Sequence, residues 1–136
     1  MNQLIQKAIQ VLKNGGIVIF PTDTAFGIGC RIDDEKAVER LFKLRKRPQN
    51  QAMSALVSSL EMAQDYTGPM PEEVIGQLIK RYWPGALTII LKSNPSTSLR
   101  ARGGGKTLGV RMPNHRVILE IIKGVGVPIL GPSANF

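Results

Sequence analysis

The apolar residues of this chain follow two alternating patterns. In five segments they recur every three or four positions, which predicts amphipathic helices over 2–13, 34–47, 59–66, 71–83 and 114–124. Five short apolar runs, rich in β-branched residues, predict strands over 17–20, 53–57, 87–91, 108–112 and 127–130. Because helices alternate with strands, we expect an α/β fold in which some strand pairs are parallel.

Polar residues and glycines are expected to mark the helix ends. Asn14 and the two glycines after it stop the first helix, and Asp33 or Asp34 caps the second. The expected buried stripe of the second helix comprises Ala37, Val38, Leu41 and Leu44. Asn114 is the expected N-cap of the last helix, which should end at Gly124.

The first predicted strand leads into small polar residues. The run 17–20 is typical of a buried strand that stops at Pro21, and Thr22, Asp23 and Thr24 follow it. Gly27 and Gly29 come next, and we expect them to let the backbone approach a ligand. This segment is therefore a candidate site wall, because ligands of open α/β sheets bind outside the carboxyl ends of strands.

The last predicted strand ends in the same way. It is followed by Gly131, Pro132, Ser133, Ala134 and Asn135. If the two strands run in the same direction, their polar ends meet at one edge of the sheet. The alternative is an ordinary strand-to-turn transition, in which Thr and Asp side chains satisfy local backbone donors.

Length and composition narrow the class of protein. A chain of 136 residues is expected to form one domain, residues 1–136, without metal or disulfide support. Cys30 is the only cysteine, and we interpret it as a small buried residue. No apolar run approaches the length of a membrane span, so we expect a cytoplasmic protein with no membrane association. The net charge of +8 favours polyanionic partners such as nucleotides or RNA.

Basic residues stand at two informative places. The end of the second helix carries Arg40, Lys43, Arg45, Lys46 and Arg47. Arg111 lies in an otherwise apolar strand, where a guanidinium needs a partner: a substrate carboxylate, or alternatively a structural Asp or Glu. The sole histidine, His115, is interpreted as structural or surface rather than catalytic.

Five ordered blocks resemble the YrdC-like threonylcarbamoyl-AMP synthase family. They are GGIVIFPTDTAFGIGC, LFKLRKRP, YWPGALTIIL, LGVRMPNH and GPSAN. The resemblance implies a twisted open mixed β-sheet with flanking helices and a positively charged cavity. It also implies an enzyme that joins L-threonine, bicarbonate and ATP, releases pyrophosphate, and supplies threonylcarbamoyl-AMP to proteins that modify tRNA. No acid, base or nucleophile is assigned, and Mg²⁺ is expected to accompany ATP.

The resemblance also implies residue roles. The expected contacts to L-threonine come from Thr24, Arg111 and Gly131. The expected contacts to ATP come from Arg45, Arg47, Gln51, Thr107, Ser133 and Asn135.

The chain also departs from the family pattern. Arg45 stands where the family usually has Lys, Leu56 where many synthases have His, and Ala52 where Pro is usual. Family domains normally continue beyond the SAN element, so we expect this chain to lack a C-terminal segment. The alternative function is a non-catalytic module of the same fold that binds double-stranded or structured RNA.

Overall fold

A six-stranded mixed sheet forms the centre of the molecule. The computed structural model describes residues 2–46, 53–132 and 134. The strands are β1 (Val18–Phe20), β2 (Gly27–Arg31), β3 (Ala55–Leu56), β4 (Ile89–Lys92), β5 (Thr107–Arg111) and β6 (Ile129–Leu130). Their order is β1-β2-β6-β3-β5-β4, in which β3 and β5 are parallel and the other neighbouring pairs are antiparallel. The predicted α/β fold with a mixed open sheet is confirmed.

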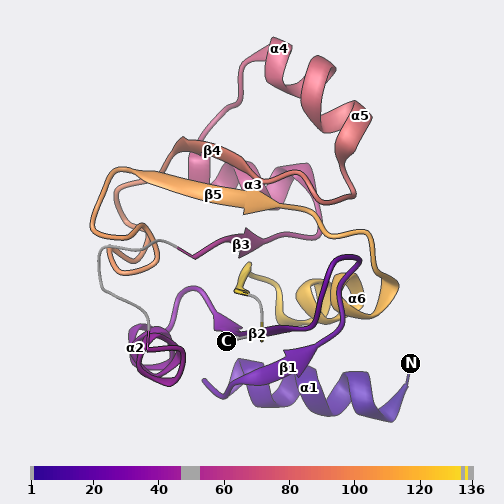
Figure 1. The fold of residues 1–136 in the computed structure, drawn as a ribbon, viewed down its shortest axis with the longest axis vertical. Helices are drawn as coiled ribbons and strands as arrows, with labels where there is room; N and C mark the ends of the chain where they lie inside the picture. The colour runs from indigo at the N-terminus through magenta and orange to yellow at the C-terminus, as the bar shows by residue number, and fades with distance from the viewer. Residues whose placement is uncertain (1, 47–52, 133, 135–136) are drawn as a thin grey trace.

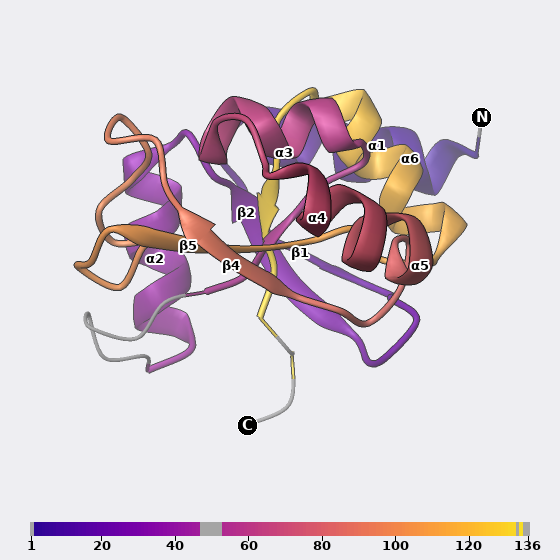
Figure 2. The ribbon, with the colours of Figure 1, turned by 90° about the horizontal axis from the view of Figure 1, so that it is seen from above.

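Helices cover both faces of this sheet. They are α1 (Gln3–Lys13), α2 (Glu35–Leu44), α3 (Leu60–Thr67), α4 (Glu72–Val74), η1 (Ile75–Ile79), α5 (Lys80–Tyr82) and α6 (Arg116–Val125). The segments α4, η1 and α5 follow one another directly, with a π-helical turn in the middle. In both views α1 runs beside α6, whereas α2 and α5 lie on opposite sides of the molecule (Figures 1 and 2).

Two hydrophobic clusters lie on the two faces. Adjacent strand residues point to opposite faces of a sheet. Leu130 packs with residues of α2 and α3, whereas its neighbour Ile129 packs with α1 and α6. The second cluster joins Ile5, Ile9 and Leu12 of α1 to Ile118, Ile121 and Ile122 of α6. The first and last predicted helices are thus confirmed, although Leu4 and Val11, also apolar residues of the first, are exposed.

The predicted buried strand at 17–20 is wrong in one respect. It forms β1, but at the edge of the sheet, where Ile19 is 63% exposed and only Phe20 is buried. The sequence patterns predict no strand after Thr24, yet Gly27 and Gly29 both lie in β2. A Cβ at Gly27 would lie 2.6 Å from Cε1 of Phe20, so the glycines make room for the Phe20 ring.

Three helix-end predictions are corrected by the structure. Leu44 is 50% exposed, and α2 ends at this residue rather than near Arg47; Phe42 is buried in its place. The N-cap of α6 is His115, whose Nδ1 accepts the Val117 N–H at 3.2 Å, so Asn114 is not the cap. The helix continues past Gly124, which packs against Ile9 of α1.

None of the helices in the described ranges is both long enough and apolar enough to cross a membrane.

The close packing over β2 leads to a stability prediction. A Cβ at Gly29 would lie 2.9 Å from Cγ2 of Ile129 and would press against the carbonyl oxygen of Leu130. Gly29→Ala is therefore expected to lower the free energy of unfolding by about 1–3 kcal/mol, measured by urea denaturation.

The matched control is Gly76→Ala in η1, where an added Cβ would meet no atom within 4 Å in the described part of the chain. This change should be neutral or stabilising by up to about 1 kcal/mol, because alanine favours helix. Equal effects of the two substitutions would contradict the packing argument.

Candidate functional site

A pocket of about 370 Å³ opens where the segments after β1 and β6 meet β3 and β5. Its walls are formed by Thr22, Thr24, Ala25, Phe26, Gly27, Ser54, Leu56, Thr88, Arg111, Gly131 and Pro132. Because β2 is antiparallel to both β1 and β6, these two strands run in the same direction. Their polar ends therefore meet at one edge of the sheet, as the sequence predicts.

The Thr22 hydroxyl builds the turn that follows β1. Its Oγ1 accepts the N–H groups of Thr24 at 3.2 Å and Ala25 at 3.1 Å, and it donates to the carbonyl oxygen of Ala25 at 2.5 Å. This is the local satisfaction of backbone donors that the alternative interpretation of the segment describes. This turn also places the side chains of Asp23 and Thr24 within hydrogen-bonding distance of Arg111.

Arg111 ties this turn to β5. Its Nε donates to the carbonyl oxygen of Gly85 at 2.9 Å, its Nη1 donates to Thr24 Oγ1 at 3.2 Å, and its Nη2 forms an ion pair with Asp23. The side chains of Arg111 and Asp23 are only 12% and 18% exposed. Asp23 is thus the structural carboxylate that the sequence interpretation named as one possible partner of Arg111.

Arg111 nevertheless retains capacity to bind a ligand. A guanidinium carries five N–H donors, and three of those on Arg111 have the partners just described. Among the described residues, no partner engages the second N–H of Nη1 or of Nη2. Because Arg111 also lines the pocket, it offers a planar fork that suits a carboxylate or phosphate.

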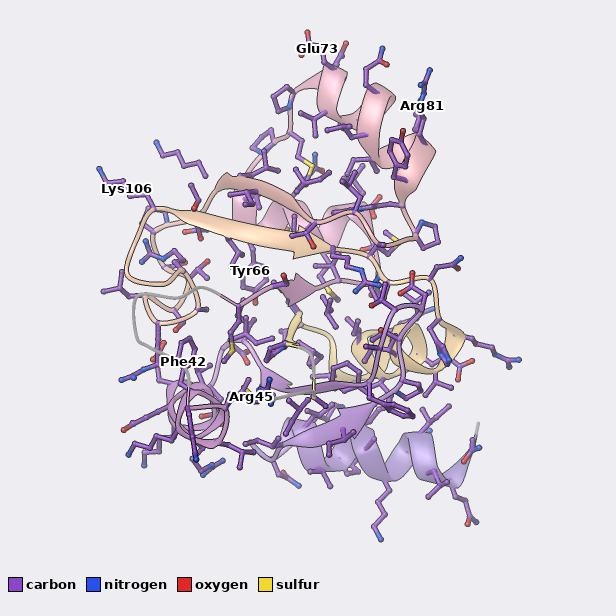
Figure 3. The ribbon with its side chains drawn as sticks, in the orientation of Figure 1. Phe42, Arg45, Tyr66, Glu73, Arg81 and Lys106 are labelled. Carbon is purple, nitrogen blue, oxygen red and sulfur yellow. The ribbon has the colours of Figure 1, made fainter. Side chains whose placement is uncertain are left out.

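The described part of the structure includes two of the six residues predicted to contact ATP, Thr107 and Arg45. Thr107 is exposed at the start of β5 and lies on the same face as Arg111, about 13 Å away at 3.3 Å per residue. Arg45 follows α2 on the side facing the rest of the molecule (Figure 3), and its Nη1 donates to the carbonyl oxygen of Ala134 at 3.4 Å. The other four lie outside the described residues: Arg47, Gln51, Ser133 and Asn135.

The sequence interpretation missed several pocket residues. Ser54, Thr88 and Phe26 all line the pocket, and Phe26 is 62% exposed. A signal for Ser54 and Thr88 is present, because each is a polar residue within an apolar run, like Arg111. Leu56, the departure from histidine, also lines the pocket and is 1% exposed, so it makes this part of the wall apolar.

Cys30 and His115 both occupy structural positions: Cys30 is buried, and His115 is the N-cap of α6. Burial raises the pKa of the Cys30 thiol to about 12, with a further contribution from Asp34, so the thiol stays protonated and unreactive near neutral pH. His115 caps α6. The described residues contain no group of three or more His, Cys, Asp or Glu arranged to hold a metal ion.

The fold and pocket define an α/β domain with a largely polar pocket at one edge of an open mixed sheet, where ligands of such sheets bind. The model of the Sua5, YciO and YrdC family, described as telomere recombination, matches residues 10–136. The chain belongs to this family.

Relatives agree with this assignment. The chain is 37% identical to threonylcarbamoyl-AMP synthase of Bacillus subtilis over 132 residues, which cover 96% of this chain and 38% of that protein. It is 31% identical to threonylcarbamoyl-AMP synthase of Klebsiella pneumoniae over 135 residues, covering 98% of this chain and 71% of that protein. The chain thus spans less than half the length of the Bacillus relative.

Solved structures show the same fold. Pyrococcus abyssi Sua5 complexed with L-threonine matches with a TM-score of 0.91 and 37% identity, over 96% of this chain and 38% of that one. Escherichia coli YciO matches with a TM-score of 0.84 and 27% identity, over 96% of this chain and 63% of that one.

The Arg111 ion pair leads to a second stability prediction. Asp23→Ala leaves a largely buried guanidinium without its carboxylate partner, so it is expected to lower the free energy of unfolding by about 1.5–3 kcal/mol.

The control is Glu39→Ala, which removes the exposed pair with Lys43 on α2, where the N–O distance is 3.2 Å. Its effect should be below about 0.5 kcal/mol. Comparable losses in both variants, measured by urea denaturation, would show that Asp23 does not anchor the turn.

Proposed function

We propose that this chain carries the substrate pocket of a threonylcarbamoyl-AMP synthase, which uses L-threonine, bicarbonate and ATP. The observation that supports this most is the convergence of Thr24, Arg111 and Gly131 on one pocket. These are the three residues that the family resemblance assigns to L-threonine. A relative with the same fold has been solved with L-threonine, and several relatives bear the name of this synthase.

Each of these three residues has a chemical reason to recognise threonine. The remaining N–H groups of Arg111 suit the substrate carboxylate, and the Thr24 hydroxyl beside them can bond a polar group of the amino acid. Gly131 would present its backbone to the amino acid, and a side chain does not fit at this position, because a Cβ there would lie 2.7 Å from Cδ1 of Leu56 and 3.0 Å from Cζ of Phe20. Asp23 then orients Arg111 rather than binding substrate itself.

ATP is proposed to lie between the threonine pocket and the basic end of α2. Its proposed contacts remain Arg45, Arg47, Gln51, Thr107, Ser133 and Asn135. Gly109 lies between Thr107 and Arg111 on the same face of β5, and the Thr88 side chain packs over it, because a Cβ there would lie 3.2 Å from Cγ2 of Thr88. Mg²⁺ would be held mainly by the triphosphate, because magnesium often binds through substrate phosphates and few protein carboxylates.

The proposed reaction has two bond-forming steps. The amine of threonine attacks the carbon of bicarbonate, with loss of water, or that of carbon dioxide, with loss of a proton, and forms a carbamate. A carbamate oxygen then attacks the α-phosphorus of ATP, and pyrophosphate leaves as threonylcarbamoyl-AMP forms. Positioning of the reactants and neutralisation of phosphate charge by cationic side chains carry such a reaction, so it requires no nucleophile from the protein.

Further parts of the proposal concern the setting of the reaction. The product would pass to tRNA-modifying proteins in the cytoplasm.

The two hydrophobic clusters on the faces of one sheet support a single domain over residues 1–136. The RNA-binding alternative is not favoured, since the named relatives are synthases.

The test is release of pyrophosphate by the chain with ATP, bicarbonate and Mg²⁺, with and without L-threonine. We expect threonine-dependent release. Thr24→Val keeps the side-chain shape but removes the hydroxyl, and should lower kcat/KM for threonine about tenfold. Arg111→Lys keeps the charge but removes the fork, and should lower it roughly a hundredfold.

Controls remove the same groups elsewhere. Thr67→Val removes a hydroxyl at the end of α3, and Arg81→Ala removes an exposed guanidinium on α5, at the far end of the molecule in Figure 3. Both should leave activity unchanged. ATP should also raise the melting temperature, because a ligand that binds the folded state stabilises it. Absence of threonine-dependent release, together with no thermal shift at millimolar ATP, would refute the proposal for this chain.

A further inference from the structure

The pocket that contains Arg111 carries hydroxyl groups of two kinds. Thr22 and Thr24 use their hydroxyls within the protein: Thr22 Oγ1 bonds inside the turn after β1, and Thr24 Oγ1 accepts from Arg111 at 3.2 Å. Ser54 and Thr88 also line the pocket, but within the described ranges their hydroxyls make no hydrogen bond. Their donor and acceptor capacity is therefore left for a ligand.

Both of these hydroxyl side chains are accessible from the pocket. Thr88 is exposed, and Ser54 is half-buried. Although Ser54 Oγ has no partner among the described residues, it is not enclosed by the protein and keeps accessible surface. A ligand in the pocket can therefore reach both groups.

The two hydroxyls flank the strand that carries Arg111. Ser54 directly precedes β3 and Thr88 directly precedes β4, and these strands lie on the two sides of β5 (Figure 1). Thr88 Cγ2 lies 3.2 Å, and Ser54 Oγ 3.9 Å, from the position of the Cβ that Gly109 lacks. Gly109 and Arg111 share one face of β5, because side chains alternate along a strand. A ligand held by Arg111 would thus lie beside both hydroxyls.

A neutral hydroxyl of the ligand suits this pair. A serine or threonine hydroxyl can both donate and accept a hydrogen bond, so it matches a partner that also does both. An ammonium group would find no carboxylate in the described lining of this pocket, and Asp23 nearby is already paired with Arg111. Phe26 and Leu56 make part of the same lining apolar, which suits a methyl group.

We propose that Ser54 and Thr88 recognise the side-chain hydroxyl of a β-hydroxy amino acid whose carboxylate lies on Arg111. This inference rests on the proposed function, since it takes L-threonine as the substrate of this pocket. It assigns the residues that distinguish threonine from valine, in which a methyl group replaces the hydroxyl. A site that pairs a substrate hydroxyl rejects the analogue without it, because the polar groups of the site are then left unpaired.

The test compares L-threonine with L-valine in the release of pyrophosphate with ATP, bicarbonate and Mg²⁺. The unaltered chain should prefer threonine, measured as the ratio of the two kcat/KM values, by roughly a hundredfold or more. Ser54→Ala and Thr88→Val each remove one hydroxyl and should each lower this ratio about tenfold, through kcat/KM for threonine. A merely structural role of either residue would lower both kcat/KM values equally and leave the ratio unchanged.

Matched controls remove hydroxyls outside the pocket. Ser58 Oγ lies 3.9 Å from Met62 Sδ, and Thr67 Oγ1 donates to the carbonyl oxygen of Ala63 at 3.2 Å. Ser58→Ala and Thr67→Val should therefore leave the preference for threonine unchanged. Melting temperatures of all four variants show whether the fold is retained.

Binding without ATP separates this inference from the proposed function. In calorimetric titrations the unaltered chain should bind L-threonine more tightly than L-valine, and the difference should shrink in the Ser54 and Thr88 variants. If these results hold but no pyrophosphate is released, the proposed reaction fails and the inference stands. If release depends on threonine but both variants keep the full preference over valine, the inference fails and the proposed function stands. Absence of threonine binding and of pyrophosphate release would overturn both.

Discussion

The placement of one buried cation governs the first pocket. The guanidinium of Arg111 binds the Thr22–Ala25 turn through Asp23 and Thr24, and it binds the segment before β4 through the carbonyl oxygen of Gly85. Since a guanidinium at 12% exposure requires partners, these contacts hold three chain segments in one arrangement. The same contacts leave part of the guanidinium fork facing the pocket. Structural support and the proposed ligand recognition therefore involve a single side chain.

Close packing over β2 gives this arrangement a firm base. The ring of Phe20 occupies the space above Gly27 and Gly29, and it lies close to Gly131 at the pocket wall. The β1 edge, the β2 strand and the segment after β6 are thereby joined through one aromatic side chain. Packed interiors transmit small volume changes, so we expect substitutions at these glycines to affect both stability and pocket shape. The glycines of the two family blocks thus have a packing reason.

The strand β6 has a polar pocket at each end, and their charges differ. The pocket after β6 presents Arg111 and hydroxyls, which suit an anionic group. The pocket before β6 presents Asp33 and Asp65, of which Asp33 is paired with Arg31. A strand of two residues separates the two in the sequence, yet antiparallel pairing with β2 and β3 directs its two ends to opposite edges of the sheet. Opposite electrostatic environments can therefore coexist in a small domain.

Local patterns in the sequence determined most elements, because apolar periodicity and capping residues act within a few positions. They predicted α1, α6 and the strand with Arg111, and they marked both polar strand ends. The edge position of β1, the strand at Gly27–Arg31 and the pairing of Asp23 with Arg111 were decided only by the tertiary structure. Glycine has a low strand propensity, and β2 is held by its pairing with β1 and β6 and by the Phe20 ring that packs over its glycines. The partner of Arg111 lies 88 positions away, and only the folded sheet brings the two together.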